Sequence, residues 1–210
     1  PLPSEAEVKR LLSRLGVAPG VQAVVYDQAT GSMAAARLWW ILQWAGHRSV
    51  AVVDGGLDAW QSAGLPLNHE PSKRPSSAFA GAFRASLVVS ANDIAETPAD
   101  AATLVDSRTP DRYRGENETI DPVAGHIPGA RCIPYPGNVH ADGRFLAVED
   151  LRSRFAGLSQ PIFYCGSGVT AAHNILAYTH ALGTMPRLYP GSWSEWITDP
   201  TRPVELGGDA

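Results

Sequence analysis

Apolar and polar positions alternate in blocks that predict short strands separated by helices. Residues 23–26 (AVVY) form an apolar run, and after a turn-rich loop residues 32–45 have helical periodicity. Residues 49–53 (SVAVV) have the pattern of a second buried strand, and a short helix around Trp60 follows. The first part of the chain is therefore expected to run strand, loop, helix, strand, helix.

The same order returns in the second half of the chain. Residues 161–164 (PIFY) predict a strand, and residues 171–182 predict a helix. Between them lies the glycine-containing loop CGSGVT, residues 165–170. This recurrence suggests that one structural unit is present twice.

Two pairs of residues measure the repeat. Asp27 lies 138 positions before Cys165, and Trp60 lies 136 positions before Trp196, so the two units agree within two residues. Strands that alternate with helices predict parallel strands joined by right-handed crossovers. We therefore expect an α/β fold, a parallel sheet flanked by helices.

The two predicted units differ in length. Residues 68–82 are rich in Pro, Ser and Ala and are expected to link a first unit, residues 1–67, to a second, residues 83–210. The second unit has an additional strand ending at Asp106, 59 residues before Cys165, and the equivalent point of the first unit would precede residue 1. The first unit is thus expected to be a back half. Either the chain is a fragment, or a separate polypeptide supplies the missing front half.

Composition is that of a globular domain and restricts the possible partners. Of the 210 residues, 44% are hydrophobic and 18% are charged. With 17 basic and 21 acidic residues the formal charge is −4, so no binding to nucleic acid or to an anionic membrane surface is expected. The cysteines and histidines lack the spacing of metal ligands, and we expect neither a metal nor a cofactor.

No membrane helix or leader is expected from the sequence. The longest apolar stretch, residues 38–45 (LWWILQWA), is far shorter than the ~20 residues of a membrane-spanning helix. The first ten residues, PLPSEAEVKR, lack the cationic start and apolar region of a secretory signal. The sequence therefore predicts a cytoplasmic location.

The loop at Cys165 is the strongest chemical signal. It follows a buried strand and opens a helix, so successive backbone N–H groups are expected to form an anion-binding nest at the positive end of the helix dipole. Glycines at 166 and 168 allow close approach of the backbone, and a nest favours the thiolate form of cysteine. The alternative is a buried, inert cysteine.

Four separated motifs resemble one known family. They are CGSGVTA (residues 165–171), DSRTPDRYRG (106–115), GHIPGA (125–130) and PGSWSEW (190–196). In this order they resemble the catalytic domain of tandem rhodaneses, the thiosulfate and 3-mercaptopyruvate sulfurtransferases. The first unit resembles the back half of the non-catalytic domain of these proteins, through VVYD (residues 24–27) and DGGLDAW (residues 54–60).

The resemblance implies a sulfurtransferase with one active site. Cys165 matches the nucleophile that takes a sulfane sulfur from a small anionic donor, becomes a persulfide, and passes the sulfur to a thiol or to cyanide. Asp27 matches its position in the first unit, and a carboxylate cannot form a persulfide. The residues that match the family's cradle around the donor are Gly166, Ser167, Gly168, Val169 and Thr170.

Arginines supply the expected charge for the donor. Arg112 matches the family's arginine for the donor's anionic group, and a guanidinium fork suits a carboxylate. Arg108 and Arg114 are both near enough in the sequence to exchange roles with it. Arg108, two residues past the strand-end Asp106, is expected to form a structural ion pair instead. The second donor-binding arginine of mercaptopyruvate enzymes has no counterpart, because Ile-Asp-Pro occupies residues 120–122.

Three further side chains have competing interpretations. His126 is expected to make a structural hydrogen bond in the GHIPG turn rather than act as a general base. Ser167 either donates to the substrate or thiolate, or caps the following helix. Cys132 is expected to lie in the core.

Two other functions compete with sulfur transfer. A phosphatase of the related fold needs an arginine six residues after its cysteine, and Ala171 stands there. A non-catalytic rhodanese-like binding module usually lacks the loop cysteine, and Cys165 is present.

Because the residues after Cys165 are uncharged, we expect 3-mercaptopyruvate to be a better donor than the dianion thiosulfate.

Overall fold

The computed structural model describes residues 2–70, 74–98 and 101–208, in two compact units. The N-terminal unit contains residues 2–85 and 141–144, and the C-terminal unit contains residues 86–140 and those from 145 onward. No helix in the described ranges has both the length and the apolar character needed to cross a membrane.

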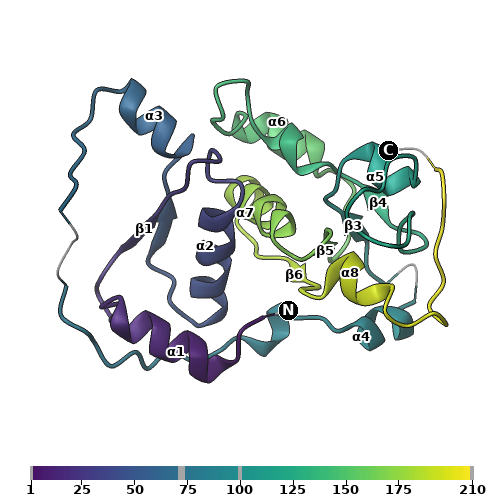
Figure 1. Cartoon of the computed structure of the whole chain (residues 1–210), viewed down its shortest axis with the longest axis horizontal. Helices are drawn as coiled ribbons and strands as arrows, with labels where there is room; N and C mark the ends of the chain where they lie inside the picture. The colour runs from purple at the N-terminus through teal and green to yellow at the C-terminus, as the bar shows by residue number, and fades with distance from the viewer. Residues whose placement is uncertain (1, 71–73, 99–100, 209–210) are drawn as a thin grey trace. The chain divides into compact units, whose positions relative to one another are not determined.

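The N-terminal unit has a small parallel sheet and three helices (Figure 1). In chain order its elements are α1 (Glu5–Arg14), β1 (Ala23–Val25), α2 (Ala34–Trp44), β2 (Val50–Val52) and α3 (Gly56–Ser62). β1 and β2 are parallel, with Ala23 opposite Val50. Helix α1 begins with a capping box, in which the Ser4 side chain accepts a hydrogen bond from the backbone of Glu7 and the Glu7 carboxylate accepts one from the backbone of Ser4.

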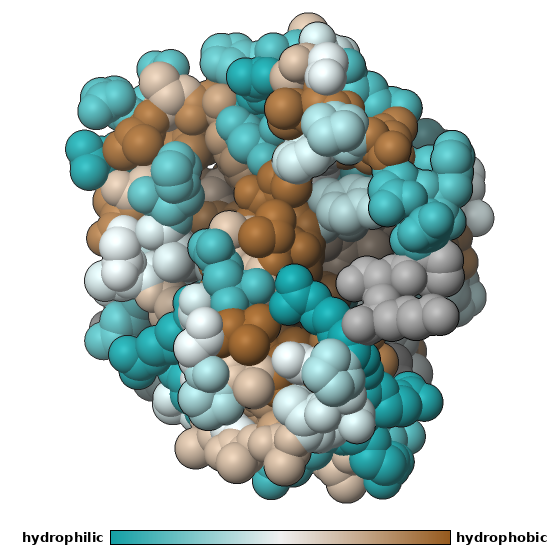
Figure 2. Space-filling model, turned by 90° about the vertical axis from the view of Figure 1, so that its left-hand side faces the viewer, coloured by the Kyte–Doolittle hydropathy of each residue, from teal (hydrophilic) through white to brown (hydrophobic). Residues whose placement is uncertain are grey.

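One face of the N-terminal unit is apolar and open. Strand β1 has β2 as its only strand neighbour in the described part of the chain, and the side chains of Val24 and Tyr26 are 56% and 60% exposed. They line a hollow together with Leu57, Trp60 and Leu67. Figure 2 shows a band of hydrophobic residues on the face that carries β1. The shortened first unit, and a second polypeptide that covers this sheet edge, stay predictions.

The C-terminal unit is built around a four-stranded sheet in the order β4-β3-β5-β6, with all neighbours parallel. Its elements are η1 (Ala85–Leu87, a 3-10 turn at the boundary), α4 (Ala91–Glu96), β3 (Leu104–Asp106), α5 (Pro110–Arg114), β4 (Arg131–Cys132), η2 (Tyr135–Asn138), α6 (Val148–Arg154), β5 (Ile162–Tyr164), α7 (Thr170–Leu182), β6 (Arg187–Leu188) and α8 (Ser192–Trp196). The α/β architecture predicted from the sequence is confirmed.

The register of the two central strands places the candidate chemistry. Asp106 at the end of β3 lies opposite Tyr164 at the end of β5. The carboxyl ends of parallel strands meet at one edge of a sheet, so the loops that follow Asp106 and Tyr164 leave the sheet together. The central strand β5 is buried along its whole length, as is the face of α7 that carries Ala171 and Ile175.

The segment expected to be a linker packs against the N-terminal unit. Ser77 donates a backbone hydrogen bond of 2.9 Å to Ser13, and the backbone of Phe79 donates to the Ser13 hydroxyl at 3.0 Å. Further on, the backbone of Arg84 donates to that of Trp44 at 2.8 Å. The described part of residues 68–82 therefore belongs to the same compact unit as the strands before it.

Candidate active site

Cys165 follows β5 directly and lies under the loop that leads into α7. Its side chain is buried, and its Sγ accepts a hydrogen bond from the backbone N–H of Gly168 at 3.1 Å. Gly168 has a φ of +77°, and a Cβ there would lie 2.6 Å from the carbonyl oxygen of Pro190. The turn that brings an N–H onto the sulfur therefore requires glycine at 168.

Helix α8 holds the backbone of this loop from the other side. The N–H of Trp193 donates to the carbonyl oxygen of Cys165 at 3.0 Å, and that of Ser194 donates to Gly166 at 2.9 Å. The N–H of Cys165 in turn donates to the hydroxyl of Ser192 at 3.1 Å. Sequence reasoning assigned no role to Ser192 or Ser194. The one signal that could have found them is their motif, PGSWSEW, which follows a short strand.

The predicted cradle residues lie in different environments around the sulfur. Gly168 is buried, Gly166, Val169 and Thr170 are half-buried, and Ser167 is exposed. Helix α7 begins at Thr170, with Val169 at the N-cap position and no side chain capping it. The capping interpretation of Ser167 is therefore wrong, because Val169 and not Ser167 is the N-cap residue and no side chain makes a capping hydrogen bond. The substrate-contact interpretation stays a prediction.

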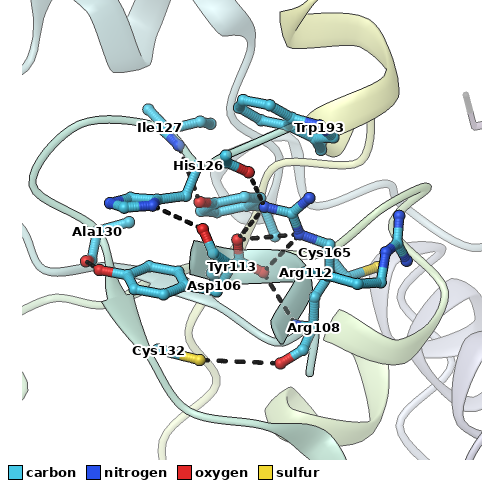
Figure 3. Close-up of polar contacts among 12 residues, drawn as sticks. Asp106, Arg108, Arg112, Tyr113, His126, Ile127, Ala130, Cys132, Cys165 and Trp193 are labelled. Carbon is cyan, nitrogen blue, oxygen red and sulfur yellow. Dashed lines mark hydrogen bonds and ion pairs between the residues drawn. The ribbon is translucent and has the colours of Figure 1, made fainter. Parts of the chain in front are cut away.

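Arg112 reaches the loop from α5. Its side chain is 17% exposed, and a Cβ built on Gly166 would lie 3.5 Å from its Nη1. Figure 3 shows the Arg112 guanidinium beside Cys165. The structure thus brings together the predicted nucleophile and the predicted anion-binding arginine, which are far apart in the sequence.

Two carboxylates that the sequence reasoning did not assign occupy the other edges of this guanidinium. Glu118 accepts from Arg112 Nη2 at 2.9 Å and from Nε at 3.0 Å, while Asp121 accepts from Nη2 at 2.9 Å. Glu118 also accepts the backbone N–H groups of Ile120 and Asp121. Burial raises the pKa of Glu118, but the two N–H groups and the Arg112 charge outweigh it, so the net shift is downward.

Arg108 has the structural role expected of it. It pairs with Asp106 at 2.6 Å, donates to the carbonyl oxygen of Gly125 at 2.7 Å, and its guanidinium lies over the Trp193 ring (Figure 3). Burial lowers the pKa of Arg108, and Asp106 overcomes that effect and raises it. Arg114 forms an ion pair of 2.9 Å with the exposed Glu116 instead.

His126 and Cys132 also behave as structural residues. His126 is 1% exposed, its Nδ1 lies 2.8 Å from the carbonyl oxygen of Tyr113, and its ring stacks on the Tyr113 ring. Burial, followed by the nearby Asp106 charge, raises the pKa of Cys132 to about 12. Cys132 is therefore a protonated thiol near neutral pH, and a protonated thiol is a poor nucleophile.

The equivalent loop of the N-terminal unit is filled by its own carboxylate. Asp27 accepts hydrogen bonds from the backbone N–H groups of Gly31 at 2.7 Å, Ala29 at 2.9 Å, Ala35 at 2.9 Å and Met33 at 3.2 Å. Burial raises the pKa of Asp27, and these four donors together lower it further than burial raises it. The loop after β1 thus forms an anion nest of the kind predicted after β5, with a carboxylate in place of the sulfur.

The internal repeat and the loop at Cys165 lie in regions that match a known domain. The family model "Rhodanese-like domain" matches residues 1–63 and 90–199, most of the chain. The chain belongs to the rhodanese family. The same family model covers both units, as the internal repeat predicts.

Relatives of this rhodanese are named as sulfurtransferases. The chain is 49% identical to a Pseudomonas aeruginosa protein named "Probable 3-mercaptopyruvate sulfurtransferase", covering 99% of this chain and 75% of that protein. It is 36% identical to the Rattus norvegicus "Thiosulfate sulfurtransferase", over 93% of this chain and 69% of the relative.

Solved structures share the rhodanese fold. SseA from Escherichia coli, described as a 3-mercaptopyruvate sulfotransferase, is 32% identical with a TM-score of 0.77, over 92% of this chain and 75% of SseA. An anaerobic ergothioneine biosynthesis enzyme from Chlorobium limicola has a TM-score of 0.88 at 23% identity, over 99% of this chain and 56% of that one. At that identity the second likeness shows the fold alone.

Proposed function

We propose that this rhodanese transfers a sulfane sulfur from 3-mercaptopyruvate or thiosulfate, through a persulfide on Cys165, to a thiol or to cyanide. Its sulfurtransferase class rests on relatives at 49% and 36% identity that carry this activity in their names. The observation that carries the assignment of Cys165 is the Gly168 N–H directed at its Sγ, in a loop beside Arg112.

In the first half-reaction the thiolate of Cys165 attacks the donor sulfur. With thiosulfate the S–S bond breaks, and sulfite leaves with the bonding electrons. With 3-mercaptopyruvate the C–S bond breaks, and the carbon leaves as an enolate that takes up a proton to give pyruvate. The N–H of Gly168 stabilises the attacking sulfur, because backbone donors aimed at a developing or existing negative charge favour the charged form.

In the second half-reaction an acceptor thiolate or cyanide attacks the outer sulfur of the persulfide. The S–S bond breaks, its electron pair returns to Cys165, and the thiolate is regenerated on Sγ. The Gly168 N–H donates a hydrogen bond to Sγ, the atom that regains this negative charge. The same contact therefore serves both half-reactions.

Arg112 and the loop are proposed to hold the donor. The Nη1 edge of Arg112 faces Gly166, and no described residue accepts a hydrogen bond from this atom. A donor carboxylate at this edge would lie at Gly166, the residue before the exposed Ser167, and we propose that the Ser167 hydroxyl contacts it. Gly168, Val169 and Thr170 complete the cradle at the start of α7.

We also propose the division into a non-catalytic unit (residues 1–67), a connecting segment (68–82) and a catalytic unit (83–210), and a cytoplasmic location. Pairing of the first unit with a separate polypeptide belongs to the same proposal. The open apolar face around β1 supports it. The proposed partners of the catalytic unit are small: an anionic sulfur donor and a thiol or cyanide acceptor.

Steady-state kinetics with thiosulfate and with 3-mercaptopyruvate test the proposal. We expect turnover with both donors, a larger kcat/KM for 3-mercaptopyruvate, and loss of turnover in Cys165→Ser because a hydroxyl cannot form a persulfide. A Cys165→Ser variant that retains turnover would refute the assignment. If the unmodified protein turns over neither thiosulfate nor 3-mercaptopyruvate, the result would favour the non-catalytic binding module.

A further inference from the structure

The charges around Arg112 do not leave the donor a positively charged site. In the cluster beside the Cys165 loop, three carboxylates face two guanidinium groups: Asp106, Glu118 and Asp121 against Arg108 and Arg112. All five side chains are at most 17% exposed. An anionic donor that binds at Arg112 therefore meets a guanidinium that is already paired on its other edges.

The two carboxylates on Arg112 have different surroundings. Glu118 is 2% exposed, also pairs with Arg108 at 3.4 Å, and accepts two backbone N–H groups, so it holds the segment that follows α5 together. Within the described part of the chain, the Asp121 carboxylate has one polar partner, Arg112, whose Nη2 donates to it at 2.9 Å. Its Oδ2 lies 3.9 Å from the position of a Cβ built on Gly166. Asp121 is thus a negative charge at the loop.

We propose that Asp121 determines donor specificity by discriminating against dianions. This inference rests on the proposed function of Cys165 and Arg112. Electrostatic repulsion between the Asp121 carboxylate and a bound donor grows with the donor's charge. Thiosulfate carries two negative charges at the reacting group, whereas 3-mercaptopyruvate carries one on its carboxylate. Asp121 therefore penalises thiosulfate more, and it does so without contacting the sulfur.

The variant Asp121→Asn tests this role while preserving the contact with Arg112. The amide oxygen of asparagine accepts the same hydrogen bond from Nη2, and only the charge is lost. We expect kcat/KM for thiosulfate to rise about tenfold relative to kcat/KM for 3-mercaptopyruvate, mostly through KM. Asp121→Glu, which retains the charge, is expected to keep the ratio of the unmodified protein.

Glu116→Gln is the matched control for net charge. It removes one carboxylate from an exposed ion pair with Arg114, so the ratio of the two kcat/KM values is expected to stay unchanged. General damage to the loop lowers the values for both donors and leaves their ratio in place. An unchanged ratio in Asp121→Asn, or a fall for thiosulfate alone, would overturn the inference.

A second readout separates this inference from the proposed function. Sulfur loaded on Cys165 is measured as thiocyanate released by cyanide, after incubation with each donor. If both donors load Cys165 and Asp121→Asn leaves the ratio unchanged, only the specificity role of Asp121 fails. If neither donor loads Cys165 in the unmodified protein, the proposed function itself fails.

Discussion

The backbone N–H of Gly168 points at the Sγ of Cys165 across 3.1 Å, three residues along the chain. This geometry depends on the positive φ of Gly168 and on the carbonyl of Pro190, which leaves no space for a Cβ. One local turn therefore links the backbone conformation to the charge on the sulfur. The proposed chemistry of this rhodanese depends on that link.

Replacing Gly168 with Ala is expected to lower both the stability of the fold and kcat/KM. The fall in kcat/KM is expected to exceed what the loss of stability alone would cause. The new Cβ would lie 2.6 Å from the Pro190 carbonyl oxygen, so the loop must shift away from Sγ. We expect a loss of about 1–3 kcal/mol in unfolding free energy and a fall of roughly ten- to a hundredfold in kcat/KM.

Gly183→Ala is the control for the backbone strain at Gly168. Gly183 has a φ of +73°, but a Cβ there has no neighbour within 4 Å. It is expected to cost about 1 kcal/mol and to leave kcat/KM unchanged. Urea denaturation and kinetics of both variants make the comparison, and equal kinetic effects would contradict the role of the Gly168 turn.

Arg112→Lys is expected to lower kcat/KM for 3-mercaptopyruvate by roughly ten- to a hundredfold. Lysine keeps the charge, but it lacks the planar fork that pairs with Glu118 and Asp121 while presenting Nη1 to the donor. A charge-assisted contact of this kind contributes about 1.5 to 3 kcal/mol. A sulfur donor without an anionic group should be affected much less, and an equal loss with such a donor would contradict the electrostatic role.

Removing Arg108 is expected to destabilise the fold rather than change donor preference. Arg108→Ala leaves Asp106 buried without its partner and removes the bond to Gly125, at a cost of about 3–5 kcal/mol. Arg114→Ala breaks only an exposed pair with Glu116, which solvent screens, and should cost much less than Arg108→Ala. Denaturant unfolding of the two variants distinguishes them, and similar losses would show that the buried pair is not the stronger one.

The two cysteines are expected to differ in reactivity across the neutral pH range. Because burial raises the pKa of Cys132 to about 12, its thiol stays protonated and unreactive between about pH 6 and about pH 9. Iodoacetamide should therefore label Cys165 first, and Cys132→Ser should retain full turnover. Rapid labelling of Cys132 in the folded protein near pH 7 would contradict this expectation.

The local elements of the fold could be predicted because their signals are local. The apolar run before Cys165 and the glycines after it predicted β5 and the loop, and the structure places both there. The pairing of Arg108 with Asp106 was predictable for the same reason, since they lie two positions apart at a strand end. Short sequence separation makes both features visible without knowledge of the tertiary fold.

The contacts that complete the site depend on tertiary structure and could not be predicted. Ser192 reaches the backbone of Cys165 from 27 residues further along the chain, which requires β6 and α8 to fold back over the loop. In the sequence, Asp121 indicates only that the second donor-binding arginine is absent. Its contact with Arg112 depends on how the segment after α5 turns, and no periodic pattern reports such a turn.

Persulfide mapping tests the central claim most directly. The full chain is incubated with 3-mercaptopyruvate without an acceptor, digested without reductant, and its peptides are analysed by mass spectrometry before and after cyanide. We predict one added sulfur atom on the peptide that contains Cys165, lost on cyanide treatment, and no addition in Cys165→Ser. Sulfur found on Cys132 alone would contradict the account.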